Sequence, residues 1–419
     1  MTMKETRKYK QTELGLLPED WEVAKLGDIG YFLKGNGISK SQANSGNLCA
    51  VRYGELYTLH HNYIKTYNSH ISKEVALFAT KIQKGDILFA CSGETKEEIG
   101  KCAAFIDEVE AYAGGDILIL RTDPKKCSDI FLGFLLNMPI AANQKAAKGQ
   151  GDAVVHISKA SLENLFIPLP PIEEQRRIAS ALTSIDNLID SLDRLIAKKR
   201  DIKQGAMQQL LSGKKRLKGF TEPWKSFKID DLFDIGNGYT PSKANPAYWT
   251  NGTIPWFRME DIRANGRILK DSIQHITEEA VKSSGLFPAN SIILSTTATI
   301  GEHALLIADS LANQRFSFLT RKLNRCSDID ILFFFYHCFI LGEWCRTNIN
   351  DGGLMAVNMN DLKNYTFPAP SLPEQQAIAS VLTTMDNELS ALEAKRKKYE
   401  QIKQGMMQQL LTGKIRLIC

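Results

Sequence analysis

The chain has no long uninterrupted apolar run. Its richest apolar segment, Ile331 to Leu341, is too short to cross a bilayer, which needs about 20 residues, and predicts a buried helix or strand. The first residues, Met1 to Gln11, are polar and rich in Lys and Arg, so we expect no secretory signal. These absences predict a chain that folds in water in the cytoplasm, with no membrane partner.

Cysteine is scarce, and its spacing fits no metal site. The 8 cysteines of the 419-residue chain include no C-x-x-C pair, which excludes a zinc ribbon or finger and favours small core residues. They are Cys49, Cys91, Cys102, Cys127, Cys326, Cys338, Cys345 and Cys419. We therefore expect no bound metal. The balance of 52 Lys and Arg to 47 Asp and Glu is compatible with a nucleic-acid partner and does not establish one.

Motifs for catalysis are missing as well. The chain has no G-x-x-x-x-G-K-[ST] phosphate loop, no H-E-x-x-H and no G-x-S-x-G. The string Asn245 to Tyr248 (NPAY) resembles the N-P-P-[FY] loop of amino-methyltransferases, but it departs at Ala247 and lacks a Gly-rich turn for S-adenosylmethionine. We predict no catalytic residue and no cofactor in this chain.

One acidic set deserves a separate comparison with metal-dependent nucleases. Asp86, Glu94 and Glu97, followed by Lys101, loosely match the acidic-plus-lysine pattern of those enzymes. The simpler interpretation, which we favour, is that Asp86 is a turn residue before a strand and that the glutamates lie in a solvated loop.

What the chain does contain is an internal repeat. The segment from Pro168, PLPPIEEQRRIASALTSIDNLIDSLDRLIAKKRDIKQGAMQQLLSGKKRL, returns from Pro368 as PAPSLPEQQAIASVLTTMDNELSALEAKRKKYEQIKQGMMQQLLTGKIRL. About half of the positions are identical without a gap. The sequence therefore predicts two tandem units, each a variable block followed by a helical block. We place the boundaries at 1–167, 168–217, 218–367 and 368–419.

Each helical block has helix signals at both ends. Ser371 and Glu374 fit a capping box, and Gly213 and Gly413 are natural stops. Apolar residues at 3,4 spacing predict a coiled-coil seam, for which the central residues are Ile178, Ile185, Leu192, Ile378, Met385 and Leu392, with Leu188 and Leu195 on the same stripe. Gly205 and Gly405 predict a break or a close helix approach.

The variable blocks repeat more faintly. Trp21 corresponds to Trp224, Gly35-Asn36-Gly37 to Gly236-Asn237-Gly238, and Ile99-Gly100 to Ile300-Gly301. Short apolar runs between turn signals predict strands. We expect helices at Asp129 to Asn137 and at Asp330 to Arg346. The predicted class is α/β in the α+β sense: two mixed domains rich in short antiparallel strands, with two long helices that form an antiparallel coiled coil, in a pseudo-two-fold repeat.

These segments together resemble a known family. GNGYTPSKANPAYWTNGTIPWFRMEDI from Gly236, STTATIG from Ser295, VRYGELYT from Val51 and AGGDILIL from Ala113 look like the recognition domains of the Type I restriction-modification specificity subunit. The two helical repeats, which begin P-x-P and end LL-[ST]-G-K, are the most specific part of the likeness. The resemblance covers essentially the whole chain.

The resemblance implies a non-catalytic DNA reader. In that family each of two target recognition domains reads one half of a bipartite asymmetric site in double-stranded DNA, and the helix pair fixes the gap between the halves. The implied partners are two modification subunits, which methylate adenine with S-adenosylmethionine, and restriction subunits, which use ATP and Mg. The charge runs 198–203 and 214–218 fit either contact with DNA phosphate or a modification subunit, or a solvated helix face.

Candidate DNA contacts are basic and aromatic side chains in loops beside the short strands. Arginine grips guanine in a bidentate way, whereas lysine mostly holds phosphate. In the first domain the candidates are Lys40, Arg52, Tyr53, Lys96 and Lys101; in the second they are Tyr239, Lys243, Arg258, Arg263, Arg267 and Arg315. A solvated surface role is the alternative for each cation, and core packing is the alternative for Tyr53 and Tyr239.

Two other functions stay open from the sequence. A coiled-coil adaptor that binds proteins predicts weak, salt-insensitive association with DNA, whereas a DNA reader predicts a steep salt dependence. An autonomous methyltransferase predicts that this chain binds S-adenosylmethionine by itself. The recognised DNA sequence and the gap length cannot be derived from the residues.

Overall fold

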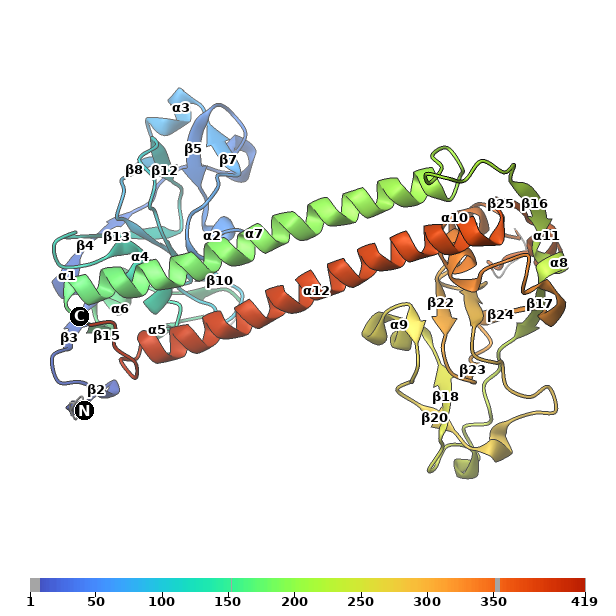
Figure 1. Cartoon of the computed structure of the whole chain (residues 1–419). Helices are drawn as coiled ribbons and strands as arrows, with labels where there is room; N and C mark the ends of the chain where they lie inside the picture. Colours follow the sequence, from blue (N-terminus) through green and yellow to red (C-terminus); the bar gives the residue numbers. More distant parts are fainter. Residues whose placement is uncertain (1–7, 152, 351–354, 419) are drawn as a thin grey trace, which may run out of the picture. The chain divides into compact units, whose positions relative to one another are not determined.

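A computed structural model describes residues 8–151, 153–350 and 355–418 of the chain (Figure 1). The chain divides into two compact units. Unit 1 comprises Met1–Asp193 and Ala394–Cys419, and unit 2 comprises Arg194–Glu393. Each unit therefore contains one variable block, the beginning of the helix that follows that block, and the end of the other long helix. In the described part of the chain no helix is both long enough and apolar enough to span a membrane.

In its described residues, unit 1 holds fifteen short strands and six short helices before its long helix. The strands are β1 Tyr9–Thr12, β2 Gly15–Pro18, β3 Glu22–Lys25, β4 Gly30–Lys34, β5 Leu48–Val51, β6 Asn62–Tyr63, β7 Ser69–Ile71, β8 Thr80–Ile82, β9 Ile87–Ala90, β10 Ser92–Gly93, β11 Cys102–Ala104, β12 Ala111–Ala113, β13 Ile117–Thr122, β14 Val155–His156 and β15 Phe166–Leu169. The helices are α1 Leu26–Ile29, α2 Tyr53–Thr58, α3 Lys73–Ala76, α4 Asp129–Leu135, α5 Pro139–Lys148 and α6 Lys159–Glu163, with a 3-10 turn η1 at Lys40–Gln42.

Unit 2 repeats this plan with fewer strands. They are β16 Lys225–Lys228, β17 Phe233–Asn237, β18 Ile254–Phe257, β19 Ile268–Leu269, β20 His275–Ile276, β21 Ser291–Ser295, β22 His303–Leu306, β23 Leu311–Ala312, β24 Phe316–Arg321 and β25 Thr366–Ala369. Its helices are α8 Ile229–Leu232, α9 Met259–Asn265, α10 Ile331–Thr347 and α11 Met359–Asn364, with 3-10 turns η2 Pro246–Tyr248, η3 Glu278–Ala280 and η4 Leu323–Arg325.

The two units share one sheet topology. A five-stranded sheet runs β4-β13-β9-β11-β6 in unit 1 and β17-β24-β21-β22-β19 in unit 2. A smaller sheet follows, β7-β5-β12-β8 in unit 1 and β20-β18-β23 in unit 2. Most pairs are antiparallel, but β6–β11, β5–β12, β19–β22 and β18–β23 are parallel. The predicted mixed class and tandem repeat are confirmed, and the order of strands, which sequence could not give, is the same in both copies.

Two helices of 39 residues dominate the rest of the chain, α7 at Ile172–Leu210 and α12 at Leu372–Leu410. At about 1.5 Å per residue each is about 58 Å long. Both are continuous at Gly205 and Gly405, and no atom lies within 4 Å of a Cβ added at either glycine. The predicted break or close approach is therefore wrong for the described residues, because these glycines sit on an open helix surface.

Ion pairs fix the direction of the two helices inside each unit. In unit 1, Asp186 pairs with Lys403 and Asp193 pairs with Arg396. In unit 2, Lys199 pairs with Glu388 and Lys203 pairs with Asp386. The residue number rises on one helix as it falls on the other. The paired helix segments are therefore antiparallel in each unit, as predicted.

Burial corrects part of the predicted seam. Ile178, Leu192 and Ile378 are buried, and Ile185, Met385 and Leu392 are half-buried. Leu188 and Leu195, however, are 37% and 38% exposed, and their neighbours Ile189 and Ile196 are buried in their place. The buried positions of α7 keep the seven-residue spacing of a coiled coil, but the second apolar position of each heptad lies four residues after the first, at Leu182, Ile189 and Ile196, and not three.

The core of each unit uses the ends of both helices. In unit 1 the apolar cluster around Trp21 and Phe131 includes Ile178 from α7 and Leu410 from α12. In unit 2 the cluster around Phe233 and Phe334 includes Leu210 and Ile378. The sequence placed a helix at Asp129 to Asn137, where α4 lies, but it missed α5, which starts anew at Pro139. The apolar run from Ile331 forms α10, with most of its side chains buried.

Candidate nucleic-acid interface

The candidates of unit 1 differ in how free their side chains are. Lys40 in η1 and Lys96 in the loop after β10 are exposed and form no ion pair within the described residues. Tyr53, at the start of α2, is 39% exposed. Arg52 is half-buried at the N-cap of α2, where its backbone N–H donates to Glu55 Oε2 at 3.1 Å. Lys101 donates from Nζ to the Tyr57 carbonyl at 3.0 Å and is thereby held in place.

The candidates of unit 2 fall into the same two groups. Lys243, Arg263 and Arg315 are exposed, and in the described part of the chain none forms an ion pair. Arg267 is bound on both sides, since its guanidinium donates to the His303 carbonyl at 2.9 Å and to Glu302 Oε2 at 2.6 Å. It therefore has a structural role on the strand edge, beside any contact with a ligand.

Tyr239 and Arg258 are held by aromatic and backbone contacts. The Tyr239 hydroxyl donates to the Ala280 carbonyl at 3.1 Å and accepts from the Lys282 N–H at 2.8 Å. The Arg258 guanidinium lies 5.8 Å from the Trp256 ring centroid, and its buried Nε has no hydrogen-bond partner among the described residues. Glu260 Oε2 lies 3.9 Å from this Nε, so the two side chains form a long ion pair without a hydrogen bond. A buried donor without a hydrogen bond is uncommon, which makes Arg258 a candidate for an external acceptor although Glu260 balances its charge.

Arg52 and Arg258 occupy equivalent places. Each is the N-cap of a short helix after the central strand of the smaller sheet, and each donates its backbone N–H to an acid three residues on, Glu55 at 3.1 Å and Asp261 at 2.7 Å. Both acids are buried. The repeat therefore presents an arginine at the same corner of each unit.

The acidic set of unit 1 is dispersed. Asp86 is fully buried, and Arg121 donates to both its oxygens, at 2.8 Å from Nε and 2.7 Å from Nη2. Asp86 Oδ2 also accepts from the Gln83 N–H at 2.9 Å, as a turn residue does. Glu94 and Glu97 lie exposed on the loop. Among the described residues no cluster of His, Cys, Asp and Glu could hold a metal ion, so this set has the geometry of a structural ion pair.

The NPAY string forms a turn. Asn245 caps η2 by accepting from the Ala247 N–H at 3.1 Å, and Thr277 Oγ1 donates to the Ala247 carbonyl at 2.8 Å. The Asn245 amide oxygen is thus used within the turn. This arrangement gives the string a structural role beside the smaller sheet.

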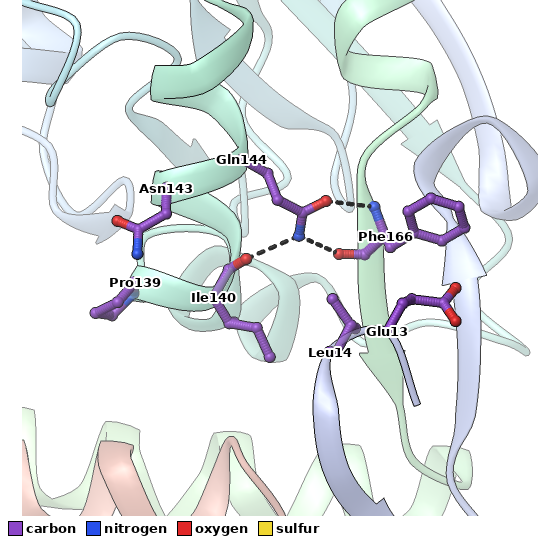
Figure 2. A pocket seen from close by; sticks show the side chains of 7 residues that line it. All are labelled: Glu13, Leu14, Pro139, Ile140, Asn143, Gln144 and Phe166. Carbon is purple, nitrogen blue, oxygen red and sulfur yellow. Dashed lines mark hydrogen bonds between the residues drawn. The ribbon is translucent and has the colours of Figure 1, made fainter. Parts of the chain in front are cut away.

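A cavity of about 550 Å³ in unit 1 lies away from these candidates (Figure 2). Gln144 bridges α5 and β15, since Nε2 donates to the carbonyls of Ile140 and Phe166, both at 2.8 Å. The lining residues are Glu13, Leu14, Pro139, Ile140, Asn143, Gln144 and Phe166. The lining has no cation to hold a phosphate, and the amide of Gln144 is already bonded to the backbone of β15.

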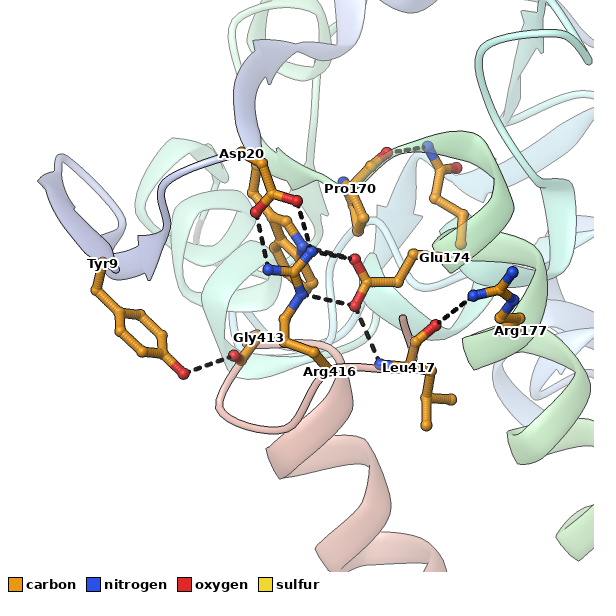
Figure 3. Close-up of polar contacts among 10 residues, drawn as sticks. Tyr9, Asp20, Pro170, Glu174, Arg177, Gly413, Arg416 and Leu417 are labelled. Atoms are coloured by element: carbon orange, nitrogen blue, oxygen red, sulfur yellow. Dashed lines mark hydrogen bonds and ion pairs between the residues drawn. The ribbon is translucent and has the colours of Figure 1, made fainter. Parts of the chain in front are cut away.

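Where the helices join the recognition domains, the two units use the same ion pair. Arg416 donates to both oxygens of Glu174 at 2.7 Å in unit 1, and Arg216 donates to both oxygens of Glu374 at 2.6 Å in unit 2. Figure 3 shows Glu174 between Arg416 and the Leu417 N–H, with Asp20 on the other side of the guanidinium. The carboxylate of Glu174 raises the pKa of Arg416.

This ion pair corrects one sequence prediction. The side chain of Glu374 is fully buried against Arg216, so it is not the N3 partner of a capping box with Ser371. Sequence reasoning missed Arg216 and Arg416, although the repeat carried a signal. Both arginines stand at the same place in GKKRL and GKIRL, as both glutamates do in the helix starts.

A second repeated contact lies further along the helices. Asp186 accepts from Lys403 at 2.5 Å and from the Tyr63 hydroxyl at 3.3 Å. Asp386 accepts from Lys203 and from the Tyr336 hydroxyl at 2.8 Å. Burial, and secondarily the charge of Asp186, raises the pKa of Tyr63, so its hydroxyl stays a proton donor. These contacts fix the position of each helix pair against its own recognition domain.

Comparison with known proteins identifies the repeat. The family model described as the Type I restriction modification DNA specificity domain matches residues 18–198 and again residues 221–404. The chain belongs to this family. Because the two matches cover most of the chain, this specificity subunit has two tandem recognition domains.

Curated relatives carry the same name. The chain is 46% identical over 191 residues to the Type I restriction enzyme EcoprrI specificity subunit of Escherichia coli. The matched region covers 45% of this chain and 47% of that subunit, so the chain spans about half of the length of this relative. It is 28% identical over 436 residues to the putative Type I restriction enzyme MjaX specificity subunit of Methanocaldococcus jannaschii, which covers 98% of this chain and 97% of the relative.

Solved structures show the same fold. The S subunit of a Type I restriction-modification system from M. genitalium superposes with a TM-score of 0.61 at 14% identity, over 98% of both chains. The HsdS subunit from Thermoanaerobacter tengcongensis gives 0.51 at 19% identity, over 95% of this chain and 98% of that one. At these identities the likeness concerns the fold alone.

Proposed function

We propose that this specificity subunit reads a bipartite, asymmetric target in double-stranded DNA, with one half read by each recognition domain. The observation that carries the proposal is a repeated fold with different side chains at equivalent places. Both units have the same five-stranded sheet order and an arginine at the same helix N-cap. However, the exposed candidate cations of the two units differ, Lys40 and Lys96 in unit 1 against Lys243, Arg263 and Arg315 in unit 2. Two similar folds with different polar surfaces suit two different half-sites.

The long helices are proposed to set the gap between the half-sites. Each is about 58 Å long, which exceeds the roughly 34 Å of one DNA turn. Their ends are anchored to the recognition domains by the Arg416–Glu174 and Arg216–Glu374 pairs. A rigid spacer between two readers makes the separation of half-sites a property of the protein.

Catalysis is proposed to belong to the partners. In this proposal the subunit itself holds no cofactor. Two modification subunits bring S-adenosylmethionine, and restriction subunits bring ATP and Mg. In the runs 198–203 and 214–218, Lys199, Arg200, Lys203 and Arg216 are paired with acids of α12. The exposed cations that support docking of a partner or of DNA phosphate by charge complementarity are Lys198, Lys214, Lys215 and Lys218. A specificity subunit would then supply the target sequence and the geometry of assembly, in the cytoplasm where its DNA lies.

The test is single-molecule methylation mapping of a plasmid in cells that express this chain with its modification subunit. The control cells lack this chain alone. The expected result is a split adenine-methylated motif that disappears in the control. No chain-dependent motif, with the assembled complex isolated from the same cells, would refute the proposal and favour the protein-binding adaptor.

Modularity gives a sharper version of the same test. Replacement of residues 12–167 by the first domain of another family member is expected to change one half of the methylated motif. Insertion of one heptad after Leu195 is expected to change the gap and to leave both halves as they are. A change in both halves contradicts the two-reader proposal, and an unchanged gap contradicts the spacer role of the helices.

A further inference from the structure

Unit 1 contains a buried lysine amine that is short of acceptors. Lys145, on α5, is 2% exposed, and its Nζ donates to the Gly100 carbonyl at 2.6 Å. In the part of the chain that the structure describes, no carboxylate oxygen lies within 4.0 Å of this amine. An ammonium group has three donors. Burial lowers the pKa of Lys145, which shows what it costs to hold this group without a counter-ion.

The amine lines a cavity of about 310 Å³, which we call the Lys145 cavity. Its polar lining includes Lys101, His61, and the loop residues Glu97 and Glu98. Both glutamates are exposed, and neither forms an ion pair within the described residues. Burial, and the charges of Lys101, Lys403 and Lys65, lower the pKa of His61. At neutral pH the lining therefore combines two amines and an uncharged imidazole with the carboxylates of Glu97 and Glu98, neither of which lies within 4.0 Å of an amine of the cavity.

Gly100 leaves the space that the side chain of Lys145 occupies. Gly100 has φ +71°, and a Cβ added there would lie 2.9 Å from Lys145 Cδ. A side chain at this position would displace the lysine stem. Gly100 also supplies the carbonyl that accepts from the amine. The position of Lys145 is thus defined by the turn before β11, and the amine is not a mobile surface group.

Unit 2 has a cavity at the equivalent place, with the charge balanced from within. Cys102 pairs with Phe89 and His303 pairs with Leu294 in matching strands, so the preceding residues, Lys101 and Glu302, are equivalent. Glu302 lines a cavity of about 730 Å³ and binds the two arginines beside it. Its oxygens lie 2.6 Å from Arg267 and 3.5 Å from Arg346.

The comparison of the two cavities points to the missing ligand. In unit 2 a carboxylate stands among the cations, whereas in unit 1 the same position carries Lys101 and adds a second amine. An external anion would take the place that the Glu302 carboxylate fills in unit 2. Lysine is a common ligand of phosphate, which it holds as a point charge. The volume leaves room for one phosphate and several waters, since a water takes about 30 Å³.

We propose that the Lys145 cavity of unit 1 is a phosphate-binding site, and that in the DNA-bound protein the phosphate belongs to the DNA backbone. The first part stands on the geometry of unit 1 alone. The second part rests on the proposed function as a DNA reader. Unit 2, with Glu302 in place, has no such site.

The first part is tested on the full chain by thermal unfolding, with inorganic phosphate titrated against chloride at constant ionic strength. Because a ligand of the folded state raises Tm with its concentration, the wild type is expected to gain Tm with phosphate. Lys145→Met, which keeps the aliphatic stem, and Lys101→Glu, which copies unit 2, are expected to gain none. Lys145→Arg is expected to keep part of the response.

Lys148→Met is the matched control on the same helix. The Lys148 amine donates to the Asn164 carbonyl at 2.9 Å, outside the cavity. This variant is expected to respond to phosphate as the wild type does. If phosphate stabilises the wild type no more than chloride does, or if Lys145→Met responds like the wild type, the cavity is not a phosphate site.

The second part is tested with the assembled complex on its mapped target, by the salt dependence of DNA binding. Lys145→Met is expected to lower the slope of log K against log salt by about one and to leave the target preference unchanged. An unchanged slope, with the phosphate response lost, would show that the site takes free phosphate and not DNA. If the wild type binds no DNA, the proposed function fails, and the thermal experiment still decides whether the cavity binds phosphate.

Discussion

The Tyr63 hydroxyl donates to Asp186 at 3.3 Å, and this bond replaces one that the second unit makes with a different element. In unit 2 the hydroxyl on Asp386 comes from Tyr336 of α10, whereas in unit 1 the equivalent helix residue is Phe134. Lys403 lies 5.6 Å from the Phe134 ring and Lys203 lies 5.8 Å from the Tyr336 ring, so the two rings are placed alike. Each unit therefore has a tyrosine hydroxyl on the equivalent aspartate, but the tyrosine comes from a different element in each unit.

This exchange predicts a rescue. Tyr63→Phe removes a hydrogen bond to a charged acceptor that keeps its lysine, so we expect a loss of about 1 kcal/mol in the free energy of unfolding. Adding Phe134→Tyr to that variant is expected to restore most of the loss, because the new hydroxyl would bind Asp186 in unit 1 as the Tyr336 hydroxyl binds Asp386 in unit 2. Urea unfolding measures both. Tyr67→Phe, whose hydroxyl meets the exposed Asp107, is the control and should change little. A double variant no more stable than Tyr63→Phe would contradict the equivalence.

A second exchange concerns the buried pair Asp86 and Arg121. The strand positions that hold this ion pair in unit 1 hold Ser291 and Thr320 in unit 2, with their hydroxyls 2.9 Å apart. Arg121→Thr alone leaves a fully buried carboxylate without its counter-ion, so we expect a loss of about 3 to 5 kcal/mol. Asp86→Ser with Arg121→Thr should cost clearly less than that single variant. Additive losses in a double-mutant cycle by urea unfolding would argue against the replacement.

Acid is expected to unfold unit 2 before unit 1. Burial lowers the pKa of His337 to about 4 and that of His303 to about 3, from 6.5. The equivalent residues of unit 1 are Leu135 and Cys102, which do not titrate in this range. Burial also lowers the pKa of His60 and His61 in unit 1, but these shifts are smaller than those of the two histidines of unit 2. The unfolded state binds protons on these histidines below pH 6.5 while the folded state does not. Their stabilisation is therefore complete above pH 6.5 and is lost as the pH falls from 6.5 to about 4 for His337 and to about 3 for His303.

Hydrogen exchange of the full chain between pH 7 and pH 4.5 checks this prediction. Protection is expected to fall first in α10 and in strand β22 of unit 2, which carry His337 and His303. His337→Phe is expected to reduce the acid sensitivity by up to about 3 kcal/mol, since each unit of pKa is worth about 1.4 kcal/mol. Equal loss of protection in the two units would show that these histidines do not control acid stability.

The sequence predicted the parts of the fold that local patterns encode. Gapless repetition and apolar spacing located both long helices, and turn signals around Gly35 and Gly236 located equivalent strands. The order of strands was out of reach, because β6, a two-residue strand, pairs with β11 across forty residues of sequence without a pattern of its own. The second position of the helix seam was off by one residue, because adjacent apolar residues such as Leu188 and Ile189 both fit a coiled-coil pattern and only the packing shows which of the two is buried.

The candidate site was predicted less completely. Arg52 and Arg258 were recognisable because each ends an apolar strand, and the structure places them at equivalent helix caps. Lys145 was not, because its isolation from carboxylates depends on how α5 packs against the turn at Gly100. Arg416 and Glu174 lie 242 residues apart, yet their repetition as Arg216 and Glu374 was a usable signal.

Gly205 and Gly405 predict a gain of stability. Each lies inside a continuous helix with open space at the position of a Cβ, so Gly205→Ala and Gly405→Ala should each stabilise the chain by about 1 kcal/mol. Urea unfolding measures the gain. Gly100→Ala is the contrasting variant and should destabilise, because of its positive φ and the nearby Lys145 stem. A destabilising Gly205→Ala would mean that the glycine face is covered in the free chain.

The repeat also predicts that half of the chain assembles with itself. Residues 1–217 contain Glu174 and Asp186, which accept in unit 1, and Lys203 and Arg216, which donate in unit 2. In one copy Glu174 and Arg216 cannot meet, because both belong to α7 and its tail and lie about 50 Å apart along the helix. Two antiparallel copies satisfy every pair twice, since Arg216 of each copy takes the place of Arg416.

We expect the 1–217 fragment to have twice the monomer mass by light scattering. With the modification subunit, it should direct methylation to a symmetric split target. Arg216→Ala should shift the fragment toward monomer, whereas Lys215→Ala, at an exposed neighbour that forms no ion pair within the described residues, should not. A monomeric fragment with an unchanged circular dichroism spectrum would show that the two helices do not substitute for each other.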